Sequence, residues 1–291
     1  MSAETVAPPA SAAPAAPEPA VRPEDGQPVD AEGLLLEQRD PLDSSVLIVA
    51  LHRPGRRNAL SPALLDALDQ RLDAAARSGD VRVVVLCGVG PVFCAGGDLG
   101  GGMGGDGVLA AHAQRGRFAQ VLERVARGPL PVIGAAAGDA LGGGFGLLMA
   151  CRMVVLAEGA TLGTPELRLG LFPMMIWPIL ARNLPVKVLH ELVLTDRRLT
   201  APDALALGAV NAVVPKDAVL QRALTMARAV AARSPAVVGL GLAAVAAVED
   251  APLDVALRHL HGQLALNLMT DDAAEGVAAF LERRPAVWSG R

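Results

Sequence analysis

Two glycine-rich turns are the residues best suited to chemistry, because each follows a strand-like apolar run. The first turn is Pro91–Leu99, after the run Val81–Leu86, and the second is Gly142–Gly144, after residues 131–136. Glycines let the backbone turn sharply and leave amide N–H groups uncovered by side chains. Two such groups, converging from separate turns, can hold a carbonyl oxygen that becomes negative during a reaction. The pattern predicts a backbone oxyanion hole and therefore acyl chemistry.

Glu166 is the acid whose surroundings best suit proton transfer. It follows a strand-like segment and precedes the apolar run 167–179. A carboxyl group among such side chains would be desolvated, which raises its pKa towards the range useful at neutral pH. Pro165-Glu166 also resembles the first turn of a helix, where a carboxylate satisfies free amides. The local sequence leaves both interpretations open.

The cysteines and histidines indicate neither a thiol nucleophile nor a metal site. Cys87, Cys94 and Cys151 form no C-x-x-C pair, which fits a reduced, cytoplasmic compartment. No neighbouring histidine suggests a thiolate at Cys94, so we interpret it as a small apolar residue leading into a tight turn. No cluster has metal-ligand spacing, and we expect no metal.

Composition excludes several classes of protein. The chain has 291 residues, 52% of them hydrophobic, and a net charge of −4. No basic tract is interleaved with aromatic residues, so we expect no nucleic-acid partner. No apolar run reaches the length of a membrane span, so we expect no membrane partner. Residues 1–30 are rich in Ala and Pro and carry several acids, which predicts a disordered tail.

The elements that must position these residues alternate between strands and helices. Strands are expected at 44–51, 81–86, 131–136 and 153–157, and helices at 62–78, 109–127 and 142–151. This alternation predicts an α/β core over residues 31–215. Beyond Pro173 the pattern is mostly helical, with one strand-like interruption at 210–214. Helices are expected at 175–184, 186–194, 201–208, 217–232, 235–248, 253–268 and 271–283. We expect the helical region 216–291 to pack onto the core or onto neighbouring subunits.

Taken in order, these motifs resemble the enoyl-CoA hydratase/isomerase (crotonase) superfamily. The resemblance covers roughly Ala31 to Trp288. It rests on Arg53-Pro54 with Asn58-Ala59-Leu60, Phe93–Leu99, Ala140–Gly144, Thr164–Glu166 with Gly170–Pro173, and Ala204 with Gly208–Asn211. It implies a spiral of repeated ββα units and a helical C-terminal region used to form a homotrimer, which can pair into a hexamer.

The resemblance also implies roles for individual residues. The amides of Gly97 and Gly143 match the two oxyanion donors, and Glu166 matches a catalytic acid. The substrate would be an acyl-CoA thioester, so coenzyme A is part of the substrate and no separate cofactor is expected. The matching coenzyme A positions are Arg56, Arg57, Ala59, Ala95, Asp98, Leu99 and Phe280. Arg56 and Arg57 suit phosphate recognition, although a merely solvated loop is an equal interpretation.

The sequence departs from the two-glutamate hydratases of this family. Their first glutamate stands where this chain has Gly146, so Glu166 would act alone or with Asp106, Glu123 or Asp139. An isomerase needs only one base, and a non-catalytic acyl-CoA-binding relative needs none. Family members that resemble hydratases of branched unsaturated acyl-CoAs also combine glycine with the later glutamate, so hydration of a 2-enoyl-CoA is our prediction.

A second departure follows Pro173. The glycine-rich turn usual in the family is replaced by Met174-Met175-Ile176-Trp177. These side chains predict either a bulkier lining near the acyl tail or ordinary helix packing.

Overall fold

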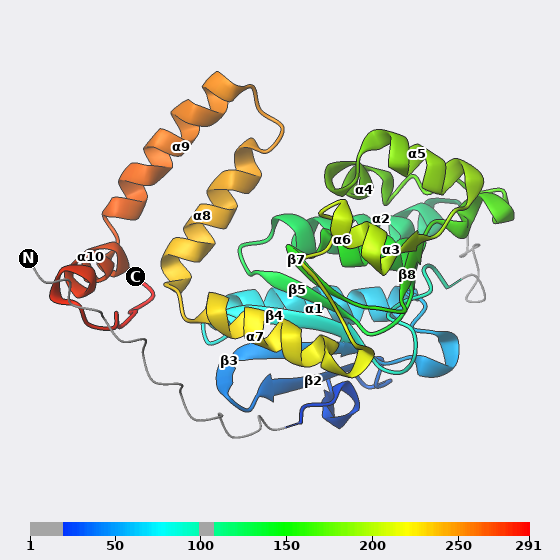
Figure 1. The fold of residues 1–291 in the computed structure, drawn as a ribbon, viewed down its shortest axis with the longest axis horizontal. Coiled ribbons are helices and arrows are strands. Elements are labelled where there is room, and N and C mark those ends of the chain that lie inside the picture. Colours follow the sequence, from blue (N-terminus) through cyan, green and yellow to red (C-terminus); the bar gives the residue numbers. More distant parts are fainter. Residues whose placement is uncertain (1–19, 99–107) are drawn as a thin grey trace, which may run out of the picture.

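The computed structural model describes residues 20–98 and 108–291. At its centre is a seven-stranded sheet of order β1-β2-β3-β4-β5-β7-β10 (Figure 1). β1, β2 and β3 pair antiparallel, whereas every pairing from β3 to β10 is parallel. The strands are β1 Gln27–Pro28, β2 Leu35–Asp40, β3 Asp43–Leu51, β4 Val83–Gly88, β5 Val132–Ala136, β7 Met153–Ala157 and β10 Ala212–Val214.

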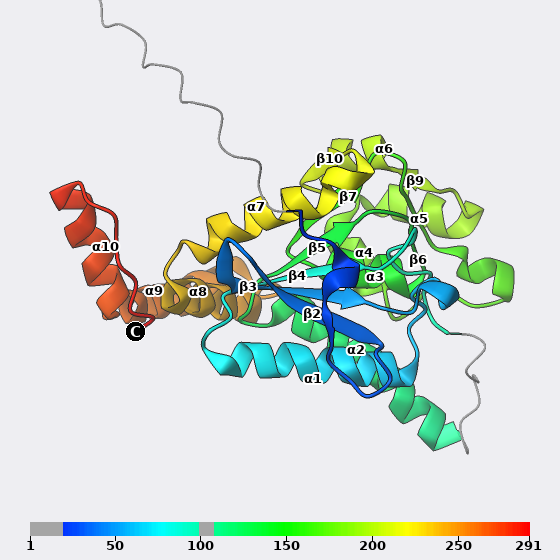
Figure 2. The same cartoon turned by 90° about the horizontal axis from the view of Figure 1, so that it is seen from below.

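Helices cover both faces of this sheet. α1 and α2 lie on one face and α7 on the other (Figure 2). α1 shows how local sequence sets an element: the Ser61 hydroxyl accepts a hydrogen bond from Leu64 N at 3.3 Å, and Gly79 ends the helix with φ of 73°. The helices are α1 Pro62–Ser78, α2 Val108–Arg127, α3 Gly143–Ala150, α4 Trp177–Asn183, α5 Val186–Thr195, α6 Ala201–Ala206, α7 Val219–Ala231, α8 Pro235–Val248, α9 Leu253–Leu268 and α10 Asp271–Glu282.

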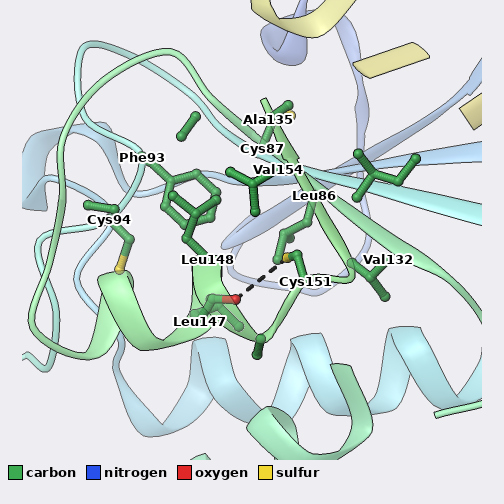
Figure 3. Close-up of a cluster of buried hydrophobic side chains, with 14 of the residues drawn as sticks. Leu86, Cys87, Phe93, Cys94, Val132, Ala135, Leu147, Leu148, Cys151 and Val154 are labelled. Carbon is green, nitrogen blue, oxygen red and sulfur yellow. Dashed lines mark hydrogen bonds between the residues drawn. The ribbon is translucent and has the colours of Figure 1, made fainter. Parts of the chain in front are cut away.

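The core is built from small aliphatic side chains and thiols. Leu147 and Leu148 of α3 belong to the same buried cluster as Leu86, Val132 and Val154 of the sheet (Figure 3). The cysteines between them are free and buried, and burial raises the pKa of each thiol to about 12. The interpretation of the cysteine at 94 as an apolar packing residue is confirmed.

A second, three-stranded sheet carries the turns of interest. Its strands are β6 Ala140–Leu141, β8 Thr161–Gly163 and β9 Leu199–Thr200, with β6 parallel to β8 and β8 antiparallel to β9. One strand of the large sheet, one of the small sheet and a helix therefore follow in sequence, as in β5-β6-α3. This is the ββα spiral expected from the sequence.

Elements of the fold lie close to both predicted domain boundaries. The short helix Pro23–Asp25 and β1 fall within the predicted tail, and Gln27 of β1 pairs with Glu37 of β2. Asp30, which the sequence analysis counted among the acids of the tail, instead accepts hydrogen bonds from the amides of Leu34 and Leu35 at 3.0 and 2.9 Å. At the start of the predicted region 216–291, α7 buries its apolar face on the large sheet, which is one of the two kinds of packing expected for that region. Residues 1–19 lie outside the described part.

The last three helices extend away from the two sheets (Figure 1). α8 packs on α9, and α10 contacts both. The buried carboxylate of Asp272 accepts hydrogen bonds from Ser234 Oγ at 2.5 Å and Ser289 N at 2.6 Å, which ties the C-terminus to the start of α8. Among the described residues no single helix is long and apolar enough to cross a membrane. One pair bent by 100°, Lys216–Ala231 with Pro235–Val248, passes that test by length and composition only.

Candidate active site

Three turns leave the small sheet at the same edge. Cys94 pairs in parallel with Ala140, and β6 pairs in parallel with β8. The chain leaves these pairings towards Gly96–Gly97, Gly142–Gly143 and Glu166 respectively. Because parallel neighbours end at the same edge of a sheet, segments far apart in the sequence meet there. The predicted oxyanion donors and the predicted acid are thus brought together.

Hydrogen bonds between the segments fix their spacing. Leu141 N donates to Cys94 O at 2.9 Å, and Gly142 N donates to Gly163 O at 2.8 Å. Asp139 supports the same edge, since its carboxylate accepts from Thr161 N at 2.8 Å. Asp139, considered above as a helper acid, therefore has a structural role.

Gly96 allows the first glycine-rich turn to pack closely against the second, Gly142–Gly144. Its φ of 99° lies in the left-handed region, which favours glycine. A Cβ there would lie 2.9 Å from Leu141 O and 3.2 Å from Gly143 N. The position needs glycine for both conformation and space, and a side chain would reach the amide that the sequence analysis predicts as a donor.

The predicted donor amides are not part of sheet pairing. The Leu60–Gly97 bridge uses the carbonyl of Gly96 and the amide of Asp98, at 2.8 and 3.1 Å from Leu60 N and O. Gly143 is the first residue of α3, and first-turn amides have no partner within a helix. Within residues 20–98 and 108–291, neither the Gly97 amide nor the Gly143 amide donates a hydrogen bond. No described residue therefore competes with a ligand oxygen for either amide.

Glu166 lies beside these amides, on the 3-10 turn Pro165–Leu169. Its Oε1 is 2.9 Å from the position that a Cβ on Gly142 would take, so the glycine at 142 leaves room for the carboxyl group. Its Oε2 is buried and accepts no hydrogen bond from any residue of the described part. A half-buried carboxyl group therefore adjoins the residue that precedes Gly143.

The electrostatics favour a proton-transfer acid over a helix-start carboxylate. Burial raises the pKa of the Glu166 carboxyl above its ordinary value, and this is the largest effect. Its own backbone amide and Arg198 lower that pKa, whereas Asp196 raises it. Of the two interpretations left open above, desolvation is the stronger influence.

Gly146 explains why a second acid would not fit beside this one. It is buried in α3, and a Cβ there would lie 2.1 Å from Ile176 Cγ2 and 2.6 Å from Ile176 Cβ. Ile176 is itself 2% exposed. The volume that a side chain at 146 needs is filled by an apolar group.

The segment after Pro173 mostly serves helix packing. The ring of Trp177 lies 5.5 Å from that of Phe172 and 5.1 Å from that of His190, between ring centroids. Met174 and Met175 are exposed. Of the two interpretations of residues 174–177, ordinary helix packing applies to Ile176 and Trp177.

A network around Arg53 joins the predicted coenzyme A positions. The Arg53 guanidinium forms an ion pair with Asp98 at 2.8 Å and donates to Ala59 O. Ala95 N donates to Arg57 O at 3.0 Å. These contacts bring together four of the predicted positions, those at 57, 59, 95 and 98.

Asn58 holds the same loop from inside. It is fully buried with φ of 54°, and its amide nitrogen donates to the carbonyls of Val89, Val92 and Phe93 at 3.0, 2.8 and 3.1 Å. Its side-chain oxygen accepts from Arg53 N at 2.9 Å. Asn58 was predicted only as part of a motif, and this role was missed; the residue follows directly after the 3-10 turn Pro54–Arg56 and Arg57.

The remaining predicted positions differ in their placement. Arg56 and Arg57 are exposed, and neither side chain pairs with an acid in the described part of the chain. Leu99 and Asp106 lie outside the described residues. Phe280 is 82% exposed on α10, at the opposite end of the molecule from α5 and β8 (Figures 1 and 2). A single chain does not bring Phe280 to the other site residues.

Four residues of the site were not predicted as such. A Cβ on Gly143 would lie 3.3 Å from both Leu60 and Phe118, which therefore flank the donor amide. Asp196 and Arg198 act on Glu166, although they lie about thirty residues further along the chain.

Glu123, considered above as a helper acid, is exposed on α2 and lies in a different cleft, with Arg152 and Arg182.

A spiral of ββα units, with one desolvated carboxyl group beside two glycine amides that have no partner among the described residues, defines a protein of the crotonase superfamily. Residues 42–291 match the sequence model of the enoyl-CoA hydratase/isomerase family, and the chain belongs to that family. The resemblance noted from the sequence is confirmed.

Relatives and solved structures agree with this assignment. The chain is 34% identical over 247 residues to the 2,3-dehydroadipyl-CoA hydratase of Escherichia coli K12, covering 84% of this chain and 96% of that protein. It is 32% identical over 250 residues to human enoyl-CoA hydratase domain-containing protein 3, covering 83% and 80%. The crystal structure of an enoyl-CoA hydratase from Mycobacterium smegmatis superimposes with a TM-score of 0.83 at 32% identity, covering 88% of this chain and 98% of that one.

Proposed function

We propose that this protein is an enoyl-CoA hydratase that adds water across the 2,3 double bond of an enoyl-CoA thioester. The observation that carries the proposal is the Glu166 carboxyl group, half-buried against Gly142, the residue before Gly143, whose amide has no partner among the described residues. The names of the relatives support hydration as the reaction of the family.

In the proposed reaction the amides of Gly97 and Gly143 hold the thioester oxygen. Water attacks C3 and loses its proton to Glu166, while the electrons of the double bond move onto the thioester as an enolate. The amides stabilise the negative oxygen, and one such donor contributes about 3 kcal/mol in comparable sites. Glu166 then returns its proton to C2, so one carboxyl group acts as base and as acid in turn.

A second candidate is an enoyl-CoA isomerase, and the packing at Gly146 favours it. Because Ile176 fills the volume beside Gly146, no second carboxylate reaches the site from that position. An isomerase needs only one base: Glu166 would take a proton from C2 of a 3-enoyl-CoA and return it to C4. A non-catalytic acyl-CoA-binding protein remains the third candidate.

Turnover assays separate the three. Purified protein is incubated with short, long and branched 2-enoyl-CoAs, and with a 3-enoyl-CoA in deuterated water. Formation of 3-hydroxyacyl-CoA supports the hydratase, and migration of the double bond without net hydration supports the isomerase. Tight binding of the thioester without chemical change would leave the binding protein.

Two glutamate variants show whether Glu166 is responsible. Glu166→Gln is expected to lower kcat by about 100-fold or more. Glu123→Gln is the matched control, because Glu123 is exposed in a different cleft, and it is expected to keep full activity. Equal turnover by both variants would refute the role of Glu166.

We also propose that the exposed loop arginines bind coenzyme A phosphates and that the chain forms a homotrimer or hexamer. Arg56 and Arg57 are exposed beside the Arg53 network. Large apolar side chains are exposed along α9 and α10, among them Leu257, Leu264 and Phe280, which supports burial against further copies. Light scattering gives the oligomer mass, and Arg57→Ala is expected to raise KM without lowering kcat.

A further inference from the structure

The segment after α5 brings two opposite charges against the turn that carries Glu166. Asp196 ends α5 with φ of 54°, which turns the chain back towards β8. β9 then pairs antiparallel with β8, Leu199 opposite Leu162, and the same register places Arg198 opposite Gly163. A Cβ on Gly163 would lie 2.7 Å from Arg198 Cδ and 3.0 Å from Nη1. Because residue 163 is a glycine, there is room for the Arg198 side chain to pass beside it.

Polar atoms of this cluster are buried without hydrogen-bond partners. Among the described residues they are Glu166 Oε2, Asp196 Oδ1 and Arg198 Nη1, whereas Asp196 Oδ2 forms an ion pair with Arg168. The Asp196 carboxylate, 12% exposed, contacts the guanidinium of Arg168 on the same turn as Glu166. Buried polar groups almost always form hydrogen bonds. A cluster of buried polar atoms without such partners therefore calls for an explanation other than stability.

The other elements near this turn place no further charge against Glu166, because their charged side chains are absent, exposed or paired with other groups. α3, which packs against Glu166, has no titratable side chain. On α5, Glu191 pairs with Arg197 at 3.3 Å and Lys187 is exposed, while His190 bonds to the backbone of its own helix. Asp196 and Arg198 are the charges that act on the Glu166 carboxyl, and they act with opposite sign.

We propose that Asp196 and Arg198 are positioning residues for Glu166, a pair of opposite charges that sets the ionisation of its carboxyl group. The carboxylate of Asp196 makes it harder for Glu166 to lose a proton, whereas the guanidinium of Arg198 attracts the ionised form. A single carboxyl group that must both take up and return a proton works best when neither its protonated nor its ionised form is strongly favoured. The effect of the pair on catalysis rests on the proposed function, but its effect on Glu166 does not.

Titration of Glu166 without substrate tests the pair directly. Protein labelled with 13C at glutamate carboxyl carbons is titrated by NMR, and the Glu166 signal is assigned by its loss in Glu166→Gln. Asp196→Asn is expected to lower the Glu166 pKa and Arg198→Met to raise it, because each variant removes one charge that acts on the carboxyl group. Asparagine tolerates the left-handed conformation at 196, so this variant keeps its fold.

Neighbouring variants supply matched controls. Arg197→Met and Asp203→Asn make the same changes of charge in the pair Arg197–Asp203, at 3.6 Å, and are expected to leave the Glu166 pKa unchanged. Arg198→Lys keeps the charge and is expected to stay near wild type. Shifts of the same sign at 196 and 198, no shift, or equal shifts in the controls would each overturn the proposal.

The pH dependence of turnover gives the second readout. The limb of the kcat profile that reports Glu166 is expected to move to lower pH in Asp196→Asn and to higher pH in Arg198→Met. A merely structural role would lower kcat without moving that limb, and this result would overturn the proposal. If no enoyl-CoA is turned over at all, the proposed function fails, while the NMR titration still decides the role of the pair.

Discussion

The packing of Gly146 against Ile176 makes a quantitative prediction for Gly146→Ala. The new Cβ would lie 2.1 Å from Ile176 Cγ2, whereas carbon atoms in contact stay at about 3.5 Å or more. Rotation of the Ile176 side chain cannot relieve the clash, because its Cβ is only 2.6 Å away. The start of α4 must therefore shift.

Two effects of known size oppose each other. Alanine in place of glycine stabilises a helix by about 1 kcal/mol, and overpacking a buried site costs about 1–3 kcal/mol. Since the clash involves a Cβ atom, we expect the upper end of that range and a net loss of about 2 kcal/mol in the free energy of unfolding. Urea unfolding followed by circular dichroism measures it.

Gly116→Ala is the control for helix propensity. Gly116 lies within α2, and apart from its chain neighbours and the backbone of its own helix, no described atom lies within 4 Å of the position of its Cβ. We expect this variant to gain about 1 kcal/mol. The difference between the two variants isolates the steric cost at Gly146.

A double variant tests whether Ile176 is the cause. Ile176→Gly removes both close atoms, so Gly146→Ala added to it should cost about 1–3 kcal/mol less than in the wild-type background. If Gly146→Ala is as stable as the Gly116 control, or if the two sites do not couple, then Ile176 does not close this volume. A second acid could then fit at position 146.

Three further predictions concern the site and its loops. Glu166→Gln is expected to raise the free energy of unfolding at pH 7: burial raises the folded pKa, so the wild type loses stability as pH rises from the unfolded value of 4.5 through the folded one. Thermal melts should show this gain at pH 7 and none below about pH 4, and an equal gain at both pH values would contradict the cause. Gly96→Ala, with its left-handed φ and a Cβ 2.9 Å from Leu141 O, should lose about 1–3 kcal/mol and at least tenfold in kcat/KM, and unchanged kinetics would contradict the geometry. Asn58→Ala leaves several buried groups unpaired and should cost about 3 kcal/mol by urea unfolding, so a loss below about 1 kcal/mol would argue against the network.

The sequence by itself determined the elements with strong local signals. Helices such as α8 and α9, and the strand β7, were predicted with the bounds that the structure shows. Helix periodicity and capping residues such as Ser234 act between neighbours in the chain, so they are readable there. The glycine turns and Glu166 were also found, because their motifs are short and contiguous.

The small sheet and its consequences were decided by tertiary structure. β6 and β9 have two residues each, too few for any periodicity. Yet the pairing of β6, β8 and β9 is what sets Gly143 beside Glu166 and Arg198 opposite Gly163. The register of such short strands follows from the packing of the whole fold, and no local pattern encodes it.

The same reason explains Gly146 and the packing of α7. The missing side chain at 146 is visible in the sequence, but the Ile176 side chain that replaces it comes from thirty residues away and is positioned by the start of α4. Likewise, the sequence of α7 indicates an amphipathic helix but does not reveal that its apolar face packs on the large sheet. Composition and periodicity specify which surfaces must be buried, whereas the partner of each surface depends on contacts between distant parts of the chain.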